Sequence, residues 1–381
     1  MLNFKVIGAG AAGNKAAIDL INAGFNRKDV TLINSTMKDI GEEYKDNSII
    51  FGVSSSFLGG CGKERSLGKR LMLADMKASA INLDNIADPQ TNAVIIVSST
   101  EGGSGSAVTP IIAKYIKEVV GLPVIVVLFF GFNSDVRGMQ NSIEIMQELS
   151  DDYTIIGICN DKFLGDGSNR PKAEAAANQK FVEIVKTLSG DGIEPSSQNI
   201  DDTDLLKIVT TPGYMMVENT SVSKYKNMDQ VSKAINVAID ESKLMDSNEL
   251  GAKRIGVIYK IQDSISEFVD YSANDLSTRY GVPYEMFTHI QDDESDTIEW
   301  IVSGLPMPID EVNEIYENYK RSSSEVNKKK DGFFDSISEL RGNSEDDMFN
   351  MFSDQTKKKT KSSFFADFEE PEEDISYNKE Y

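Results

Sequence analysis

The sequence predicts an α/β fold: a doubly wound, Rossmann-like parallel sheet, then a long central helix, a smaller α+β domain and a charged tail. Two observations in the first half support this class. Apolar runs such as 92–100 and 122–130 show no polar alternation, and segments with helical spacing separate them. Such runs are typical of parallel strands that helices cover on both faces.

The first half begins with a strand from Phe4, which leads through a glycine turn into a helix that Gly24 ends. A second helix is expected from about Ser106 to Val120. Pro110 is tolerable in it only near the helix start, because proline lacks the N–H that later turns need. Further buried strands are expected at 29–35, 92–100, 122–130 and 153–160.

The alanine-rich segment 172–190 predicts the long central helix, which Gly190 closes. After it the pattern changes. An amphipathic helix at 228–245 precedes strands with partial alternation, which indicate a smaller sheet with one face more exposed. These strands are expected at 252–261, 284–292 and 297–305.

The predicted boundaries are 1–171 for the first domain, 172–214 for the central helix with the acidic loop after it, 215–318 for the second domain and 319–381 for the tail. The tail composition cannot bury enough apolar surface to fold, so we expect it to be disordered. Two similar pieces in it, 328–340 and 358–370, each carry Phe-Phe after lysines. They are either accidental likenesses in a solvated tail or short docking motifs.

The composition excludes several classes of protein. The 381 residues carry a formal net charge of -22, which argues against a body that embraces nucleic acid or an anionic membrane. Two cysteines, no signal peptide and no apolar run of membrane length predict a cytoplasmic protein. His289 is the only histidine, which removes most zinc sites and histidine-assisted triads, and we expect it to be structural.

Two glycine-rich loops follow predicted strands and open predicted helices. The first matches G-x-G-x-x-G, but Asn34 stands where a dinucleotide site wants an acid. Neither loop is a Walker A motif. Two such loops on one sheet can wrap a triphosphate with backbone N–H groups, although a turn used only for tight packing is the alternative. The loop residues are Gly8, Gly10, Ala11, Ala12, Gly13 and Asn14, and then Gly102, Gly103, Ser104, Gly105 and Ser106.

An acidic loop follows the central helix. Asn199, Asp201 and Asp204 can converge on one point there. Paired acids can orient a water molecule and tune a metal-bound phosphate. A solvated turn or a helix N-cap is the other interpretation.

These residues resemble the tubulin/FtsZ GTPases. The second loop is similar to their G-G-G-T-G-T-G-A-A-P: three glycines and Pro110 match, two serines keep the hydroxyls, and Glu101 and Ala107 depart from glycine. The acidic loop fits their N-x-D-x-x-D without substitution. Such a Glu101 should repel phosphates unless it turns outward or meets a metal. With the motifs below, the resemblance covers roughly residues 3 to 310 in collinear order.

Other motifs extend the resemblance. Asn14 is in register with the first FtsZ phosphate loop, and "LINST" resembles the I-N-T-D loop with Thr36 in place of the acid. "GICNDKFL" places Asn160 beside the guanine and ribose. Asn178 takes the place of the guanine-reading asparagine, and Gln179 stands where FtsZ has Asp.

Two loops are less regular matches. "GFNSDVR" supplies Arg137 for the ribose, but Asn133 replaces the acid, for which Asp135 is the candidate substitute. Residues 59–69 resemble the loop that senses the terminal phosphate, where Cys61 is a space-filler rather than a nucleophile.

The resemblance implies GTP and GDP as ligands, with Mg²⁺ held through the phosphates. It implies half a site per subunit: the acidic loop of the next subunit completes it in trans, in a head-to-tail filament with assembly-dependent hydrolysis. The loop 34–40, "TTPG" and the charged tail resemble the TubZ-type plasmid and phage branch. That branch implies DNA segregation or positioning through a DNA-bound adaptor that docks on the tail.

Three alternatives stay open. A cell-division filament of the FtsZ type differs only in partners. A non-hydrolysing tubulin-like scaffold would lack GTPase activity, against which the intact acid pair argues. An NAD-linked oxidoreductase would share the first glycine loop, and bound nucleotide from the purified protein separates it from a GTPase.

Overall fold

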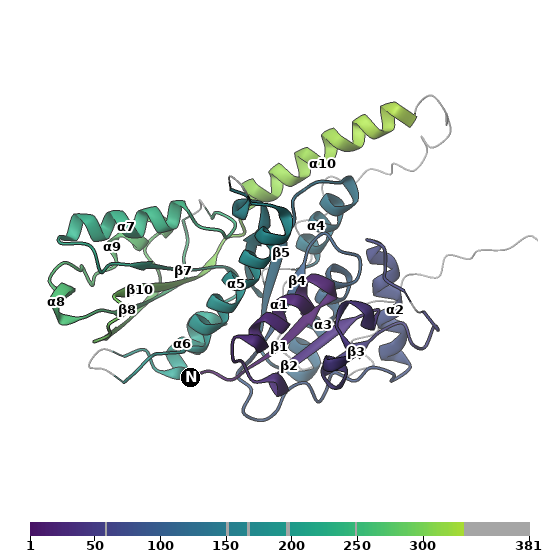
Figure 1. Ribbon diagram of the computed structural model, residues 1–381, viewed down its shortest axis with the longest axis horizontal. Helices are drawn as coiled ribbons and strands as arrows, with labels where there is room; N and C mark the ends of the chain where they lie inside the picture. Colours follow the sequence, from purple (N-terminus) through teal and green to yellow (C-terminus); the bar gives the residue numbers. More distant parts are fainter. Residues whose placement is uncertain (58, 150–151, 166–167, 196–198, 248–249, 331–381) are drawn as a thin grey trace, which may run out of the picture.

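The computed structural model describes residues 1–330, except 58, 150–151, 166–167, 196–198 and 248–249. The Phe-Phe pieces of the tail lie outside the described residues, apart from the start of the first. Figure 1 shows two halves joined side by side, with the helix α5 (Arg170–Ser189) running between them. The α/β class expected from the sequence is confirmed.

A single ten-stranded sheet runs through both halves, in the order β3-β2-β1-β4-β5-β6-β7-β10-β8-β9. Neighbours from β3 to β7 are parallel, and β10 pairs antiparallel with both β7 and β8. The strands are β1 (Phe4–Ala9), β2 (Val30–Asn34), β3 (Ser48–Ile50), β4 (Ala93–Ser99), β5 (Val124–Phe130), β6 (Thr154–Cys159), β7 (Gly213–Ser221), β8 (Arg254–Lys260), β9 (Glu285–Gln291) and β10 (Thr297–Leu305).

The second sheet that the sequence predicts is therefore not separate. The strand β7 joins the two halves, since it pairs with β6 on one side and β10 on the other. Sequence reasoning missed β7, which follows the "TTPG" turn. The continuous sheet makes the two halves one hydrogen-bonded unit.

Helices cover the sheet. Strands β4, β5 and β6 are almost wholly buried, as expected for strands covered on both faces. The helices are α1 (Gly10–Asn22), α2 (Arg65–Lys77), α3 (Gly105–Tyr115), α4 (Val136–Glu148), α5, α6 (Asp202–Val209), α7 (Met228–Asp240), α8 (Asp263–Ser266), α9 (Asn274–Tyr280) and α10 (Ile309–Lys330). Short 3₁₀ turns lie at Arg27–Asp29, Met37–Asp39, Glu42–Asn47 and Asn160–Phe163.

The central helix α5 has clear signals at both ends. The side chain of Asn169 caps its N-terminus, Pro171 follows in the first turn, and Gly190 ends it at a φ of +74°. The helix packs on α1, and Phe181 and Leu188 are buried on its inner face.

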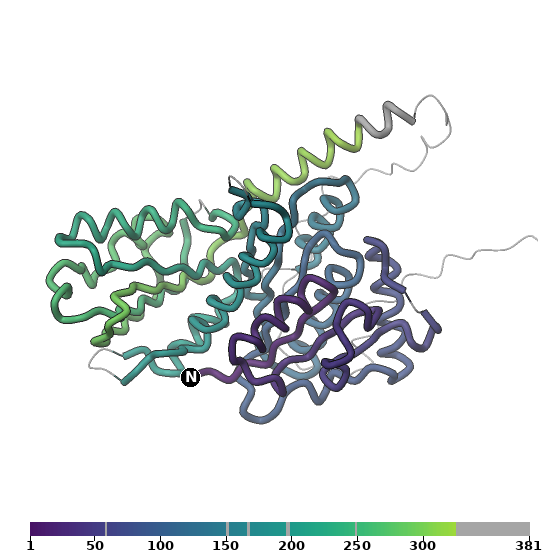
Figure 2. Tube along the Cα trace, viewed as in Figure 1, coloured from purple at the N-terminus to yellow at the C-terminus, as the bar shows by residue number. Residues whose placement is uncertain are grey.

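The helix α10 continues into the predicted tail. It reaches Lys330, so residues 319–330 are helical, and the predicted start of disorder at 319 is wrong. Figure 2 shows this helix projecting from the body. Val312, Ile315 and Tyr319 pack against the core, and they anchor its first turns. Beyond them the helix is polar, which is why composition alone indicated disorder there.

Pro110 lies in the interior of α3, and a side chain compensates for its missing N–H. The Ser106 carbonyl, which a residue at position 110 would normally bond, accepts a hydrogen bond from the Arg65 guanidinium at 3.0 Å. The helix starts at Gly105 and passes into a π turn at Ile116–Val120 before Gly121 ends it. The predicted helix of 106–120 is thus present, in two parts.

Candidate functional site

The two glycine loops lie in direct contact. A Cβ at Gly10 would lie 2.6 Å from the Gly105 nitrogen, and a Cβ at Gly105 would collide with the Ala9 carbonyl. Gly10 also has a φ of +72°, which favours glycine. Strand order reverses between β1 and β4, so both loops lie at the switch point where open α/β sheets bind ligands.

The helices α1 and α3, which follow these loops, begin without a side-chain cap. Ala9 and Ser104 make no capping hydrogen bond, and neither helix has an acid in its first turn. By contrast, Asp135, Asn169 and Asp201 cap α4, α5 and α6. Free N–H groups and the positive end of a helix dipole attract anions. Two adjacent uncapped N-termini are therefore suited to hold phosphate groups.

Around the loops, several predicted residues are fixed by hydrogen bonds. Asn14 is fully buried and donates to the Ile33 carbonyl at 3.3 Å, while its Oδ1 has no partner among the described residues. Asn34 is also buried, and its amide donates to Asp39 at 3.1 Å. The hydroxyls of Ser35 and Ser104 lie 3.2 Å apart, which links the end of β2 to the second glycine loop.

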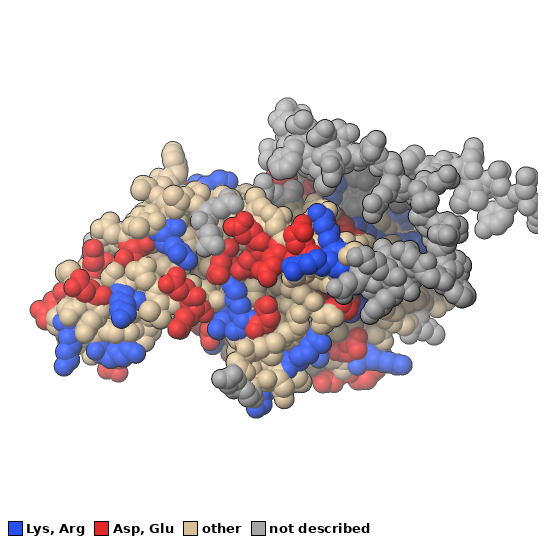
Figure 3. All heavy atoms as spheres, turned by 90° about the horizontal axis from the view of Figure 1, so that it is seen from above, with Lys and Arg blue, Asp and Glu red and all other residues tan. Residues whose placement is uncertain are grey.

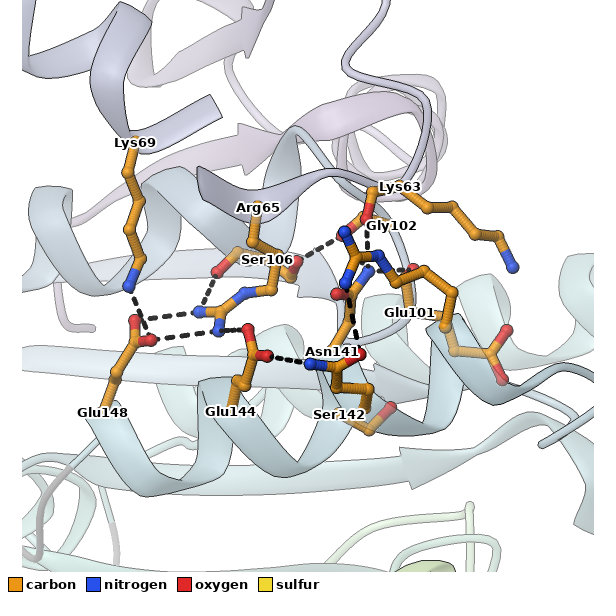
Figure 4. Close-up of polar contacts among 12 residues, drawn as sticks. Lys63, Arg65, Lys69, Glu101, Gly102, Ser106, Asn141, Ser142, Glu144 and Glu148 are labelled. Carbon is orange, nitrogen blue, oxygen red and sulfur yellow. Dashed lines mark hydrogen bonds and ion pairs between the residues drawn. The ribbon is translucent and has the colours of Figure 1, made fainter. Parts of the chain in front are cut away.

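The segment 59–64 closes over the second glycine loop. A Cβ at Gly103 would lie 2.7 Å from the Cα of Lys63, so the two backbones touch, whereas Gly102 has open space around it. The Asn141 amide, on α4, donates to the carbonyls of Lys63 at 3.0 Å and of Glu101 at 2.9 Å (Figure 4). Asn141 thereby holds both segments in place, a role that sequence reasoning missed because its partners are distant in the chain.

Arg65 is the centre of a buried ionic network. Its side chain is 2% exposed, and its guanidinium pairs with Glu144 at 2.9 Å and Glu148 at 2.8 Å (Figure 4). Lys69 also pairs with Glu148, at 2.6 Å. The network joins α2, α4 and the start of α3, so it sets where the second glycine loop lies. A single sequence gives no signal for it, since the partners are on separate helices.

Replacing Arg65 by Met is expected to lower the free energy of unfolding by about 2–4 kcal/mol. It removes a buried cation and leaves the Ser106 carbonyl without a donor. Lys69→Met is the matched control, because Lys69 is 33% exposed and its pair should contribute at most about 1 kcal/mol. Urea unfolding of both variants measures the difference. Equal losses would show that the buried network does not position the loop.

Glu101 turns neither outward nor toward the open side of its loop. Only 8% of it is exposed, and its Oε1 accepts a hydrogen bond from the Asn133 N–H at 2.9 Å, in the loop between β5 and α4. Burial raises the pKa of this carboxyl, and the Asn133 N–H and the charge of Lys63 partly offset that increase. Of the two alternatives drawn from the sequence for Glu101, the outward orientation is therefore wrong, and contact with a metal stays a prediction.

Asp135 is already fully engaged. Its Oδ1 caps α4 by accepting from the Gly138 N–H at 2.8 Å, and its Oδ2 pairs with Lys63 at 2.5 Å. Burial alone would raise the pKa of Asp135, but the ammonium of Lys63 and the capping N–H hold that pKa below its ordinary value. Both oxygens of the Asp135 carboxylate are thus engaged within the chain, and its part in ribose binding stays a prediction.

The remaining predicted contacts are spread around this edge of the sheet. Arg137, in the first turn of α4, is exposed, with Gln140 at 3.1 Å and Glu64 at 3.5 Å. Asn160 follows β6, and its Oδ1 is buried without a partner in the described part of the chain. Asn178, on α5, donates its amide to Asp19 of α1 at 2.8 Å.

The acidic loop lies at the far end of α5. Asp201 caps α6 by accepting from the Asp204 N–H at 2.8 Å, and Asn199 is exposed. Asp204 lies 3.6 Å from Lys207. The amino group of Met1 binds Asp202 at 2.7 Å, and the N-terminus is marked beside α6 in Figure 1. Part of the N-cap interpretation therefore holds, because Asp201 does cap a helix.

The two sets of residues are separated by the length of α5. Arg170, at its N-terminus, stacks on the Phe132 ring at 4.4 Å, beside the glycine-loop edge. Its C-terminal end leads into the acidic loop (Figure 1). A helix of 20 residues spans about 30 Å. The fold brings the glycine loops together and keeps the acids away from them.

His289 supports the acidic loop from β9. It is fully buried, its Nδ1 lies 3.4 Å from the Ile200 N–H, and its Nε2 lies 2.9 Å from Gln291. This arrangement needs the neutral ring, with Nδ1 as acceptor. Burial lowers the pKa of His289 below its ordinary value of 6.5, and the nearby charge of Lys260 lowers that pKa further. His289 thus has the structural role expected from the sequence, and that role is to hold the acidic loop.

Acidification is expected to destabilise the protein through His289. Below pH 6.5, His289 binds a proton in the unfolded chain but stays neutral in the folded chain. The free energy of unfolding therefore falls there by at most about 1.4 kcal/mol per pH unit. Above pH 6.5 the contribution is constant. His289→Asn keeps an acceptor but does not titrate. Urea unfolding at pH 7.5 and 5.5 should show a smaller loss in this variant, and an unchanged loss would assign the pH dependence to other groups.

The order of the strands and the two adjacent glycine loops at the switch point define a tubulin-like fold. Residues 3–167 of this chain match the family model "Tubulin/FtsZ family, GTPase domain". The resemblance drawn from the motifs is thereby confirmed.

Among its relatives, cell division protein FtsZ 2 of Haloferax volcanii is 28% identical over 235 residues, which cover 61% of this chain and 57% of that protein. The match thus spans less than two thirds of that relative.

Two solved structures are similar in fold. A GTPγS-form protofilament of Bacillus thuringiensis serovar israelensis TubZ has a TM-score of 0.69 at 16% identity, covering 87% of this chain and 95% of that one. The GTPγS-bound protofilament of CetZ2 from Haloferax volcanii has a TM-score of 0.66 at 16% identity, covering 87% and 100%. They confirm the tubulin-like fold. Among the described helices, none is both long and apolar enough to cross a membrane.

Proposed function

We propose that this chain is a GTP-dependent polymerising protein that forms head-to-tail filaments and hydrolyses GTP between successive subunits. The observation that carries the proposal is the placement of the glycine loops and the acidic loop at opposite ends of α5. About 30 Å of helix prevents Asp201 and Asp204 from reaching phosphates on their own chain. A second subunit stacked head to tail brings its acids there.

The phosphates are held by the two glycine loops. The backbone N–H groups of Gly10, Ala11, Ala12 and Gly13 and of Gly102, Gly103, Ser104, Gly105 and Ser106 are the donors, and Gly8 lets the first loop pack. Among the described residues, no cluster of three or more His, Cys, Asp or Glu could hold a metal. We therefore assign Mg²⁺ to the phosphate oxygens, where it supplies charge neutralisation.

The nucleoside is assigned to the side of β6 and α5. The carbonyl oxygen of the Asn160 side chain is buried and has no partner in the described part of the chain. Asn178 gives its amide to Asp19, which leaves its Oδ1 free to accept from a base N–H. Arg137 remains the candidate for the ribose or phosphate edge.

Hydrolysis is assigned to Asp201, Asp204 and Asn199 of the adjoining subunit. Carboxylates at this position can orient the attacking water and accept its proton. Asp204, at 28% exposure, is open to a partner. Two of the structural neighbours are protofilaments with GTPγS, which supports assembly of the nucleotide-bound form.

Light scattering and electron microscopy with GTP and with GTPγS test the proposal. We expect filaments with both nucleotides, longer-lived with the analogue, and phosphate release that appears only above a threshold protein concentration. Absence of filaments with both would refute it. Release that is linear from the lowest concentration would refute the in-trans site, and chromatography of bound nucleotide would reveal NAD.

For the cellular role, we propose segregation or positioning of plasmid or phage DNA through an adaptor that docks on the tail. The TubZ neighbour supports this role, and the FtsZ relative favours cell division as the second candidate. On the face in Figure 3, basic and acidic side chains alternate without a continuous basic strip, which fits an adaptor better than direct DNA binding. Deleting the gene should cause loss of the DNA element. Undivided cells would instead indicate division.

A further inference from the structure

The side chain of Glu101 starts in the second glycine loop but ends in the neighbouring loop between β5 and α4. A Cβ at Gly131 would collide with its carboxyl group, and one at Gly138 would lie 3.1 Å from its Cδ. Gly131 and Gly138 therefore leave the space that this carboxyl group fills. Figure 4 shows Glu101 and Lys63 extending to the same side, away from the Arg65 network.

One oxygen of Glu101 is engaged and the other is available. Oε1 accepts from the Asn133 N–H at 2.9 Å, where Asn133 has a φ of +47°, a conformation that asparagine tolerates. Among the described residues, no donor hydrogen-bonds Oε2. Lys63, the nearby cation, is paired with Asp135 instead. A carboxylate oxygen so enclosed favours a ligand that donates a hydrogen bond.

The Glu101 carboxyl group lies beside Gly131, which follows the last residue of β5. The phosphate loops follow β1 and β4, Asn160 follows β6, and the end of β5 lies between them. On the proposed function, a nucleotide that runs from the glycine loops to Asn160 and Asn178 crosses the end of β5 with its ribose. That is where the Glu101 carboxyl group lies.

We propose that Glu101 binds the ribose: its Oε2 accepts a hydrogen bond from a 2′- or 3′-hydroxyl, while Asn133 holds Oε1 through its backbone. A carboxylate at the end of a strand is the usual partner of a ribose hydroxyl in Rossmann folds. Here the acid has moved from the β5–α4 loop, where Asn133 now stands, to the adjacent phosphate loop. This position also accounts for an acid so near the phosphates, because its charge points away from them.

Binding of GTP, 2′-deoxy-GTP and 3′-deoxy-GTP below the assembly threshold tests this assignment. The wild-type protein should bind GTP about ten- to a hundredfold more tightly than one of the deoxy nucleotides, as expected for a hydrogen bond to a charged group. Glu101→Ala should reduce the ratio to a few-fold or less. Glu101→Gln, which keeps the volume, should reduce it in the same direction if the alanine variant does not fold.

Asn133→Gly is the matched control, because it keeps the backbone N–H and the positive φ but removes the amide side chain. It should retain the preference for GTP. Loss of the preference in Asn133→Gly, together with its retention in the Glu101 variants, would assign the ribose to Asn133 and overturn the proposal. Equal wild-type binding of all three nucleotides would also overturn it. Failure to bind any of them would refute the proposed function itself.

Discussion

Asp204→Asn is expected to bind GTP and form filaments but to lose at least about 10²-fold in GTP turnover, since general-base and water-orienting groups contribute about 10²- to 10⁴-fold. The substitution removes a charge and little else: Asp204 is on the first turn of α6, and among the described residues its side chain pairs only with Lys207, at 3.6 Å. Phosphate release and sedimentation with GTP measure the two effects separately. Normal GTP turnover in this variant would show that the Asp204 carboxylate takes no part in hydrolysis.

A mixing experiment distinguishes action in trans from action in cis. Asp204→Asn keeps its glycine loops, and Gly105→Ala keeps its acidic loop. If the acid acts on the neighbour, each variant alone is inactive and a mixture recovers part of the turnover. A mixture as inactive as its components would show that both loops are needed on one chain. Asp201 is unsuited to this test, because it caps α6 and its loss also disturbs the helix.

Gly105→Ala is expected to abolish GTP binding and to lower the free energy of unfolding by about 1–3 kcal/mol. A Cβ there would collide with the Ala9 carbonyl and lie 2.5 Å from the Ser98 hydroxyl, so the two glycine loops must separate. Fluorescent-nucleotide titration and urea unfolding measure the two losses.

Gly102→Ala is the matched control, in the same loop. Nothing lies within 4 Å of a Cβ at Gly102, so the variant should keep its stability. Any loss of nucleotide binding in it would then come from contact with the ligand. Normal GTP binding by Gly105→Ala would show that the contact between the two glycine loops serves only tight packing. The phosphates would then bind elsewhere.

The sequence predicted the parallel sheet, the central helix and both glycine loops because their signals are local. Continuous apolar strands, Gly190 and the glycine spacing each lie within a few residues. The strand β7 and the helix α10 were both missed. β7 is recognisable only from its neighbours β6 and β10, and the polar end of α10 continues a helix that Val312 and Ile315 anchor.

The predicted site residues are placed as two groups, but their supports were not foreseen. Asn141, Arg65 and His289 hold the loops through contacts that cross 40 to 89 positions of sequence. Glu101 shows the limit most clearly. Its departure from glycine was visible in the sequence, but its direction depends on the space left by Gly131 and Gly138, which only the fold reveals.

In the proposed polymer, the length of helix α5 sets the distance between the glycine loops and the acidic loop of each subunit. Both ends of the helix are defined by caps, so its length sets how far each acidic loop projects from the phosphates of its own subunit. One inserted residue would add about 1.5 Å and turn the loop by about 100° relative to the body. The acidic loop would then no longer align with the neighbouring subunit, although the single chain would still fold. In the proposed filament, the residue count of this one helix would thus set the spacing between nucleotide and acidic loop.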